Sequence, residues 1–226
     1  MQVQIGAVIF DMDGLMLDTE PLYRAAWQQA AIGLGYVLSE ATYSRMIGRK
    51  TEDAEHLMFD EFGPGFPIDA FRQGYRKLES EFQRSPLPKK RGLDALLDLL
   101  DSRRVPKAVA TSTRRIVAVA ELFATGLLHR FDVIVTGDDV TNGKPAPDLF
   151  LLAAERLGID PARCLVLEDA ESGVIAAHRA GMQVYMVPDL QPPSPRTEQM
   201  ANRIFGSLDQ VAAHFEMSLA PPRPTQ

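Results

Sequence analysis

Residues 8–14 spell Val-Ile-Phe-Asp-Met-Asp-Gly, an apolar run that ends in two carboxylates and a glycine. The run predicts a buried strand, with Asp11 and Asp13 at the point where the strand ends. Because residues two apart in an extended chain point to the same side, both carboxylates are expected to face one point. Burying two like charges together is costly unless a cation or a shared proton compensates them. The pattern therefore favours a catalytic carboxylate pair with a bound metal over an ordinary acidic turn.

Composition and charge limit the class of protein. The chain has 226 residues, 46% of them hydrophobic, which is enough for one large domain or two modest ones with a substantial core. The formal net charge of −6, without a long run of lysine or arginine, argues against a nucleic-acid partner. Cys164 is the only cysteine, so an internal disulfide is excluded, which fits a reducing cytoplasm. No apolar run reaches the roughly 20 residues of a membrane span, and no signal peptide is visible. We therefore expect a cytoplasmic protein without membrane association.

The spacing of apolar residues divides the chain into two parts. From residue 18 to residue 86 the spacing is helical, with helices expected at 51–62 and 68–82 and a break at Gly63-Pro64-Gly65. From Gly92 onward, strand-like and helix-like runs alternate. Alternation of this kind predicts right-handed βαβ units and a parallel sheet with helices on both faces. The expected later strands cover residues 105–110, 133–135, 164–167 and 184–187.

The helical part interrupts the alternating part. The first strand, near residues 5–10, should join the same sheet as the later strands, so the helical segment is an insertion between them. We expect an α/β fold with a core of residues 1–17 and 87–220 and an inserted all-helical domain of residues 18–86. The proline-rich end, residues 221–226, is expected to be a disordered tail.

Polar residues follow several of the expected strands. In sheets of this kind, ligands bind beyond the carboxyl ends of the strands, so these residues are candidates for a functional site. Taken singly, each has an ordinary explanation as a helix cap, a first-turn acid or a solvated lysine. Acids, hydroxyls and a lysine at one edge of one sheet are harder to explain by capping alone. The residues concerned are Thr111, Ser112, Lys144, Glu168 and Asp169.

This set of residue types is suited to phosphoryl transfer. The carboxylates of Asp11, Asp13 and the Glu168-Asp169 pair are hard oxygen ligands of the kind that Mg²⁺ prefers. One carboxylate can attack phosphorus, and a second, two residues away, can protonate the leaving oxygen and later deprotonate water. A hydroxyl, a helix N-terminus and a lysine can hold the oxygens of the transferring group.

The order and the context of these residues resemble the haloacid-dehalogenase superfamily. The match extends from near residue 5 to near residue 190, and four ordered motifs with a helical insertion after the first are highly specific. The chain looks most like the subgroup that contains β-phosphoglucomutase-like proteins and sugar- or nucleoside-phosphate phosphatases. The segments that carry the resemblance are Asp11-Met12-Asp13-Gly14, Leu17-Asp18-Thr19-Glu20, Thr111, Gly143-Lys144-Pro145-Ala146-Pro147-Asp148 and Glu168-Asp169-Ala170-Glu171-Ser172-Gly173.

The resemblance implies a fold, a cofactor and two catalytic roles. The fold is a Rossmann-like core of three α/β/α layers, and the helical segment is a mobile cap that closes over the site and selects the substrate. The implied cofactor is Mg²⁺. Asp11 would be the nucleophile and a ligand of Mg²⁺, and Asp13 would be the general acid and base, with its backbone carbonyl on the metal.

The resemblance also implies the binding residues. Thr111 and Lys144 would hold the phosphoryl group, together with the neighbouring Ser112. Asp169 would complete the metal site, with Glu168 ligating directly or through water. The expected partner is a small phosphorylated metabolite, and the protein is expected to be a monomer, as is common among such proteins.

The helical segment bears on the choice between hydrolysis and transfer to a second sugar phosphate. Mutase-like members carry a histidine shortly after the Asp-Thr pair, where this chain has Tyr23, whose hydroxyl titrates too high to replace it. Arg49 lies close to, but out of register with, a mutase arginine that grips a second phosphate. We therefore expect a phosphatase that acts on a sugar or nucleoside phosphate through an aspartyl-phosphate. The alternatives are a β-phosphoglucomutase-like mutase and a non-catalytic phosphate-binding module. Tyr23, Arg49 and Lys50 are candidate substrate contacts in the cap.

Overall fold

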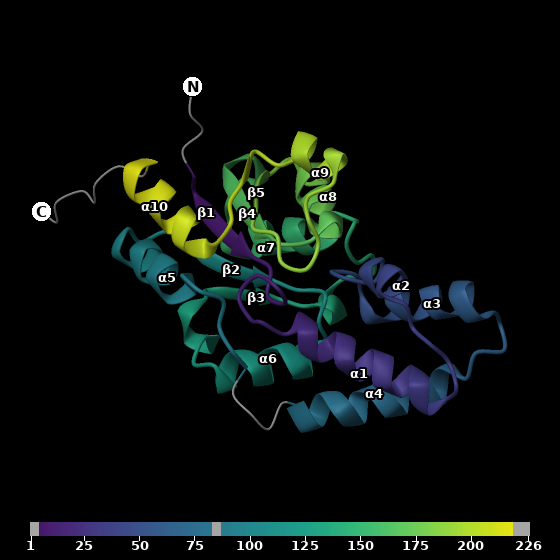
Figure 1. The fold of residues 1–226 in the computed structure, drawn as a ribbon. Helices are drawn as coiled ribbons and strands as arrows, with labels where there is room; N and C mark the ends of the chain where they lie inside the picture. The colour runs from purple at the N-terminus through teal and green to yellow at the C-terminus, as the bar shows by residue number, and fades with distance from the viewer. Residues whose placement is uncertain (1–4, 83–86, 219–226) are drawn as a thin grey trace, which may run out of the picture.

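The structure is a computed structural model that describes residues 5–82 and 87–218 (Figure 1). Within these residues, six parallel strands form one sheet in the order β3-β2-β1-β4-β5-β6, which confirms the expected parallel α/β core. The tail expected at residues 221–226 lies outside the described residues. The strands are β1 (Ala7–Phe10), β2 (Lys107–Ala110), β3 (Val133–Val135), β4 (Cys164–Glu168), β5 (Gln183–Met186) and β6 (Arg203–Ile204).

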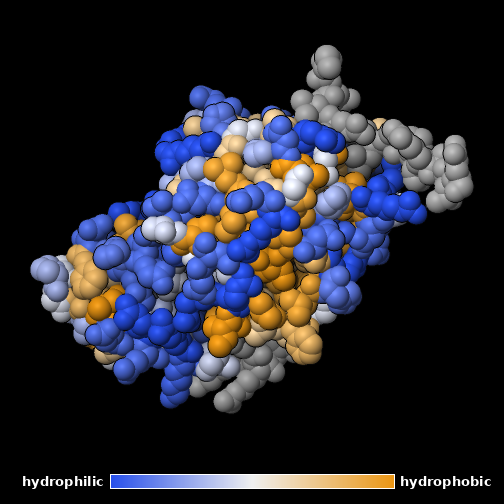
Figure 2. Space-filling model, turned by 180° about the vertical axis from the view of Figure 1, so that it is seen from behind, coloured by the Kyte–Doolittle hydropathy of each residue, from blue (hydrophilic) through white to orange (hydrophobic). Residues whose placement is uncertain are grey.

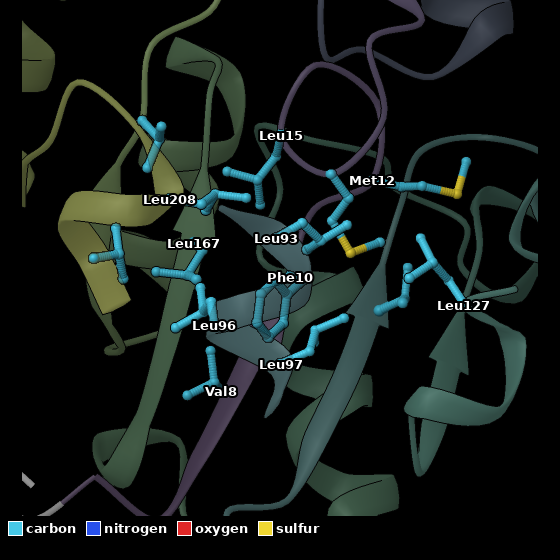
Figure 3. Close-up of a cluster of buried hydrophobic side chains, with 14 of the residues drawn as sticks. Val8, Phe10, Met12, Leu15, Leu93, Leu96, Leu97, Leu127, Leu167 and Leu208 are labelled. Atoms are coloured by element: carbon cyan, nitrogen blue, oxygen red, sulfur yellow. The ribbon is translucent and has the colours of Figure 1, made fainter. Parts of the chain in front are cut away.

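Alternate residues of β1 pack into two hydrophobic clusters, one on each face of the sheet. Val8 and Phe10 belong to the first cluster, and Figure 3 shows Phe10 surrounded by leucine side chains. Ala7 and Ile9 belong to the second cluster. A strand that is buried on both faces has to be apolar throughout, which explains the uninterrupted run before Asp11. The first face is covered by α5 (Leu93–Ser102), α6 (Arg115–Ala124) and α10 (Leu208–Ser218), the second by α7 (Asp148–Leu157) and α8 (Glu171–Arg179), and α9 (Pro195–Met200) precedes β6.

The central position of β1 determines where the polar residues gather. The chain passes from β1 to β2 and β3 on one side and then crosses back to β4 on the other, so a topological switch point lies at β1. Phe10 is paired with Val109 of β2 and with Leu167 of β4. The residues that follow in each strand therefore come together at one edge of the sheet.

The helices between β1 and α5 surround a hydrophobic core of their own. Trp27 stacks on Tyr75 with ring centres 4.9 Å apart and meets Phe71 edge-on at 5.3 Å. In Figure 1 these helices lie together on one side of the sheet, beyond the end of β1. They are α1 (Glu20–Gly33), α2 (Glu40–Ser44), α3 (Thr51–Phe62) and α4 (Ile68–Phe82), of which the last two have the expected bounds.

The two segments that connect the sheet to these helices run side by side. Leu17 forms an antiparallel bridge with Lys89. The ammonium group of the next residue, Lys90, donates hydrogen bonds to the carboxylates of Asp18 at 2.7 Å and Asp189 at 2.6 Å. Burial lowers the pKa of Lys90, but its two carboxylate partners outweigh this effect and raise it. The helical segment thus enters and leaves the core through one paired ribbon.

Some large apolar side chains lie outside the two faces of the sheet. Figure 2 shows hydrophobic residues gathered in a band on the back of the molecule. Among the described residues, Ile116 and Phe123 of α6 are exposed, and so is part of Leu151 of α7. These side chains do not contribute to the packing of the sheet.

The helices are also short by the standard of membrane spans. The longest of those described, α4, has 15 residues, fewer than the roughly 20 that a span needs. No helix in the described part of the chain combines the length and the apolar character that crossing a bilayer requires.

Candidate active site

Lys144 is a nearly fully buried cation, with 1% of its side chain exposed. Its ammonium group donates hydrogen bonds to the carboxylate of Asp11 and, at 2.5 Å, to Oε1 of Glu168. Burial alone lowers the pKa of a lysine, but the attraction of these two carboxylates outweighs it, so the pKa of Lys144 is raised. Lys144 is therefore charged at neutral pH and joins the side chains that lie at the ends of β1 and β4.

Both oxygens of Glu168, the last residue of β4, accept hydrogen bonds. Oε1 accepts from Lys144, and Oε2 accepts from the backbone N–H groups of Asp169 at 3.0 Å and Ala170 at 3.1 Å, at the start of α8. Gly173 makes room for this carboxylate, since a Cβ atom at that position would lie 1.8 Å from Oε1. Glu168 is thus held in one orientation by Lys144 and by the backbone between β4 and α8.

The carboxylates of Asp11, Glu168 and Asp169 form an acidic cluster in which one oxygen of each lies within 4.8 Å of the others. Burial raises the pKa values of Asp11 and Asp169, and the nearby charge of Glu168 raises both further. The single ammonium of Lys144 does not balance three buried acids. Gly14, with φ at +78°, leaves space for the cluster, because a Cβ there would lie 2.2 Å from Oδ2 of Asp169. Hard oxygen donors with a deficit of positive charge fit a small divalent cation such as Mg²⁺.

The Asp13 carboxylate lies outside this cluster and is held by threonines. Its Oδ1 accepts a hydrogen bond from Thr19 at 2.8 Å, and its Oδ2 accepts from Thr113 at 2.6 Å and Thr111 at 3.4 Å. Burial raises the pKa of Asp13, and the threonine hydroxyls partly offset the increase. The sequence analysis did not assign Thr19 or Thr113. The position of Thr113 could have been predicted from the sequence, because a residue two positions after Thr111 faces the same side in an extended segment.

The predicted phosphate-binding residues separate into two groups. Thr111 is buried beside Asp13, and its Oγ1 accepts a hydrogen bond from the N–H of Thr113 at 3.0 Å. The hydroxyl of Ser112 is directed to the helical segment, where it donates to the carbonyl oxygen of Gly48 at 3.2 Å. Thr111 and Lys144 therefore lie next to the two catalytic candidates, whereas the side chain of Ser112 links the core to the helical segment.

A cavity lies between the strand ends and the helical segment. Its lining includes Asp11, Asp13 and Thr111 from the core. On the helical side the lining includes several aromatic residues and two carboxylates, Glu20 and Glu79. Burial raises the pKa of each of these glutamates to about 7. The aromatic residues of the lining are Tyr23, Trp27, Tyr43 and Tyr75.

The three candidate substrate contacts of the helical segment differ in their positions. Tyr23 lines the cavity, and its hydroxyl donates to Glu121 of α6 at 2.6 Å. Arg49 also lines the cavity, although its Nε donates to a backbone carbonyl of its own segment. Lys50 instead extends toward the loop before Lys144, where its ammonium donates to the carbonyl oxygen of Val140 at 3.0 Å. The structure thus brings Tyr23 and Arg49, but not Lys50, to the cavity.

Comparisons with known proteins agree with this geometry. Residues 8–187 match the family model described as haloacid dehalogenase-like hydrolase. The chain is 35% identical over 177 residues to a phosphorylated carbohydrates phosphatase of Thermotoga maritima. The aligned part covers 78% of this chain and 82% of that protein. It is 36% identical to the fructose-1-phosphate phosphatase YqaB of Escherichia coli, over 80% of this chain and 96% of that protein.

Solved structures of similar proteins share the fold of this chain. The crystal structure of a putative beta-phosphoglucomutase from Thermotoga maritima superposes with a TM-score of 0.75 at 31% sequence identity, covering 95% of this chain and all of that one (100%). CbbY from Rhodobacter sphaeroides, crystallised with phosphate, has a TM-score of 0.77 at 25% identity, over 92% of this chain and 96% of that one. The chain therefore belongs to the haloacid dehalogenase-like hydrolase family, and within that family it is a phosphoric monoester hydrolase.

Proposed function

We propose that this chain is a Mg²⁺-dependent phosphatase that hydrolyses a small sugar or nucleoside phosphate through an aspartyl-phosphate formed on Asp11. The contact between Lys144 and Asp11 is the observation that supports the proposal most directly. It sets a nucleophilic carboxylate against a cation, in a cavity that also contains a second acid, Asp13. Nucleophilic catalysis at phosphorus needs these elements, because the attacking and transferring groups are both anionic.

In the first half of the reaction, an oxygen of Asp11 attacks the phosphorus atom, and the bond between phosphorus and the ester oxygen breaks. Asp13 gives its proton to that oxygen, so the leaving group departs as an alcohol. The raised pKa of Asp13 favours the protonated form that this step requires. Thr19 and Thr113 act as positioning residues, because their hydroxyls hold both oxygens of Asp13.

In the second half, water replaces the alcohol. Asp13, now ionised, takes a proton from a water molecule whose oxygen attacks phosphorus, and the bond between phosphorus and Asp11 breaks. Inorganic phosphate leaves, and both aspartates return to their starting states. Thr111 and Lys144 are the donors that we assign to the oxygens of the phosphoryl group, where they stabilise the charge that develops.

The residues that we assign to Mg²⁺ are Asp11, Asp169 and the backbone carbonyl of Asp13. Bound there, the ion would supply positive charge that screens the repulsion between the nucleophile and an anionic ester. Both oxygens of Glu168 hold hydrogen bonds to Lys144 and to the backbone at the start of α8. We therefore assign to Glu168 a contact with the ion through water rather than direct ligation.

We propose that residues 18–86 are a cap over a core of residues 1–17 and 87–220. The separate hydrophobic core of the helical segment supports this division. Two contacts, from Tyr23 to Glu121 and from Ser112 to the carbonyl of Gly48, join the segment to the core. A cap that closes over the cavity excludes bulk water, so that electrostatic interactions inside become stronger. Its lining then selects the leaving group. The relatives named for phosphorylated carbohydrates and fructose 1-phosphate support a sugar phosphate as the substrate.

The test measures phosphate released from p-nitrophenyl phosphate and from a panel of sugar and nucleoside phosphates, with and without Mg²⁺. We expect turnover that depends on Mg²⁺, and no phosphoenzyme in Asp11→Asn, because an amide does not form the acyl phosphate. Asp13→Asn is expected to form phosphoenzyme from p-nitrophenyl phosphate, whose leaving group needs no proton, and to release phosphate slowly. Tight binding of esters without turnover by the metal-loaded wild-type protein would indicate a non-catalytic binding module instead.

The same assay separates hydrolysis from transfer to a second sugar phosphate. The hydroxyl of Tyr23, which stands where mutase-like proteins carry a histidine, is engaged by Glu121, and burial raises its pKa well above the usual range of a tyrosine. It is therefore unsuited to assist proton transfer at neutral pH. We expect free phosphate from β-glucose 1-phosphate supplied with a trace of bisphosphate. Formation of glucose 6-phosphate without free phosphate would reverse this preference.

A further inference from the structure

The three tyrosines on the helical side of the cavity each direct their hydroxyl hydrogen to a glutamate. A tyrosine hydroxyl has a single hydrogen to donate, so none of the three is left to donate to a ligand. These tyrosines therefore offer only acceptor oxygens to whatever binds there. The pairs are Tyr23 with Glu121 at 2.6 Å, Tyr43 with Glu20 at 3.2 Å, and Tyr75 with Glu55 at 2.8 Å.

Of the acids beside these rings, Glu20 and Glu79 belong to the lining of the cavity. Glu55 is turned to Arg72, which binds it through two nitrogens at 2.6 and 2.9 Å. Glu20 already accepts the hydrogen of Tyr43, whereas Glu79, from α4, accepts from none of the three tyrosines. A carboxylate has two oxygens that accept hydrogen bonds, so Glu79 can accept one from a ligand in the cavity.

Two of the rings of the wall, those of Trp27 and Tyr75, do not offer an open face to a flat ligand. Trp27 is 6% exposed and lies between Tyr75, on which it stacks, and the edge of Phe71. Tyr75 is 2% exposed. A nucleobase needs a free aromatic face for stacking, whereas a hydroxylated carbon chain needs acceptors for its O–H groups. The wall therefore suits the second kind of leaving group.

The lining also contains two arginines. Arg114 follows Thr113 directly, and its positive charge acts on Glu79 and opposes the effect of burial on that carboxylate. Arg49 lines the cavity as well, with its Nε donating to the carbonyl oxygen of Arg45 at 2.8 Å. Burial still raises the pKa of Glu79 to about 7, so at neutral pH a substantial part of this carboxylate is in its accepting, ionised form.

We infer that Glu79 is a specificity-determining residue, whose carboxylate accepts a hydrogen bond from a hydroxyl group of the leaving alcohol. The site then selects phosphate esters of polyhydroxylated carbon chains over esters of the same size without hydroxyls. This inference rests on the proposed phosphatase function and extends it to the part of the substrate that does not react. A site that is built to bind a hydroxyl discriminates strongly against an analogue that lacks it.

The experiment compares esters that differ in their hydroxyls. Fructose 1-phosphate, glucose 6-phosphate and glycerol 3-phosphate are compared with propyl phosphate and p-nitrophenyl phosphate, whose leaving groups carry no further aliphatic hydroxyl. For the best of the three hydroxylated esters, we expect Glu79→Met to lower kcat/KM by about tenfold or more, the loss of one charge-assisted hydrogen bond, and Glu79→Gln to lower it less. For propyl phosphate and p-nitrophenyl phosphate, both variants should stay within about twofold of the wild type.

Glu61→Gln, the same change at an exposed position of α3, is the matched control and should leave all five esters unaffected. Equal losses on hydroxylated and plain esters would assign Glu79 a purely structural role and overturn the inference. Unchanged kinetics would overturn it as well, and so would a wild-type protein that prefers propyl phosphate. Failure of the proposed function looks different, because wild-type protein would then release no phosphate from p-nitrophenyl phosphate. Glu79→Gln keeps the size of the side chain and one acceptor oxygen, so it tests the inference even if Glu79→Met folds poorly.

Discussion

A single ammonium group, that of Lys144, touches two of the three carboxylates in the acidic cluster. Removing two opposite charges from water is expensive, and their attraction recovers the loss only when both partners are present. Asp11 and Glu168 are almost completely buried, so each depends on Lys144 for its charge balance. The residue that we assign to phosphoryl binding is therefore also a structural element of the protein before any substrate arrives.

Lys144→Met tests this double role. We expect it to abolish measurable turnover and to lower the free energy of unfolding by about 3–5 kcal/mol, because it leaves buried carboxylates without their partner. Urea unfolding followed by circular dichroism gives the stability. Lys77→Met, at an exposed position of α4, should leave the stability nearly unchanged. A Lys144 variant as stable as the wild type would show that the acids are compensated in another way.

Glu79 predicts a pH dependence of stability. Its pKa is raised from 4.5 to about 7, first by burial, while Trp27, Arg114 and Arg76 lower it and Asp13 raises it. An acid with a raised pKa in the folded state binds its proton more tightly there than in the unfolded chain. Its contribution to stability is therefore complete below pH 4.5 and is lost as the pH rises through about 7.

We therefore expect Glu79→Gln to reduce the loss of thermal stability between pH 5 and pH 8, which differential scanning calorimetry at the two pH values would measure. Glu61→Gln, at an exposed position, should retain the slope of the wild type. If Glu79→Gln and the wild type lost stability in parallel, Glu79 would not titrate in this range.

At the level of secondary structure, the start of α8 is shaped by the carboxylate that precedes it. Glycine inside a helix is destabilising by about 0.5–1 kcal/mol relative to alanine, so its presence at position 173 calls for a reason. Glu168 provides it, because any side chain at Gly173 would overlap Oε1. Glycine at position 173 thus makes α8 less stable but leaves the space that the carboxylate of Glu168 occupies.

Gly173→Ala is predicted to displace Glu168 and to lower kcat by about tenfold or more, because misplacement of a supporting residue disturbs the groups that it orients. The matched change is Gly33→Ala, also at a helical glycine, where an added Cβ meets no atom within 4 Å. Gly33→Ala should leave kcat unchanged and should be neutral or slightly stabilising. Metal affinity, measured by calorimetric titration with Mg²⁺, should fall in Gly173→Ala alone.

Most helices and strands could be predicted from the sequence, but not all of them. The helices at 51–62 and 68–82 were predictable, since Gly63-Pro64-Gly65 separates two runs with helical spacing. The convergence of Asp11 and Lys144 was predictable too, because parallel strands bring their carboxyl ends to one edge. The strand β6 was not, because Arg203 and Ile204 are too few residues to produce a periodic signal.

The helical side of the cavity was the least predictable part. Trp27 and Tyr75 are separated by a large part of the helical segment, and only the folding of this segment stacks their rings and brings Glu79 into the same cavity lining. Periodicity assigns such residues to a buried helix face but does not say which of them face a cavity. The hydrogen bond from Tyr23 to Glu121 likewise joins residues of different helices, α1 and α6, and no local sequence pattern predicts it.

At the level of the whole molecule, the paired ribbon connects the sheet to the helical segment. Lys90 is 23% exposed and binds two carboxylates, whereas its neighbour Lys89 is 33% exposed and, within residues 5–82 and 87–218, forms an ion pair with Asp94 alone, which is 57% exposed. Buried and networked ion pairs contribute more than exposed ones, because solvent screens the latter. Lys90 should therefore matter more than Lys89 to the stability of the ribbon.

We expect Lys90→Met to lower the free energy of unfolding by about 1–3 kcal/mol, since it leaves Asp189 partly buried without its cation. Lys89→Met should change it by about 0.5 kcal/mol or less. Chemical denaturation of both variants in parallel gives the comparison. A ribbon that does not depend on its ion pairs would give equal values for the two lysines.

The bridge between Leu17 and Lys89 has a consequence beyond stability. The point where the chain departs from the sheet and the point where it returns are neighbours, and a tight turn of about two residues suffices to close antiparallel ends of this kind. Replacing all four helices by such a turn would leave every strand pairing intact. A protein engineer can therefore lengthen, shorten or exchange this segment while the sheet keeps its strand order, provided that a hydroxyl is retained for Asp13 in place of Thr19.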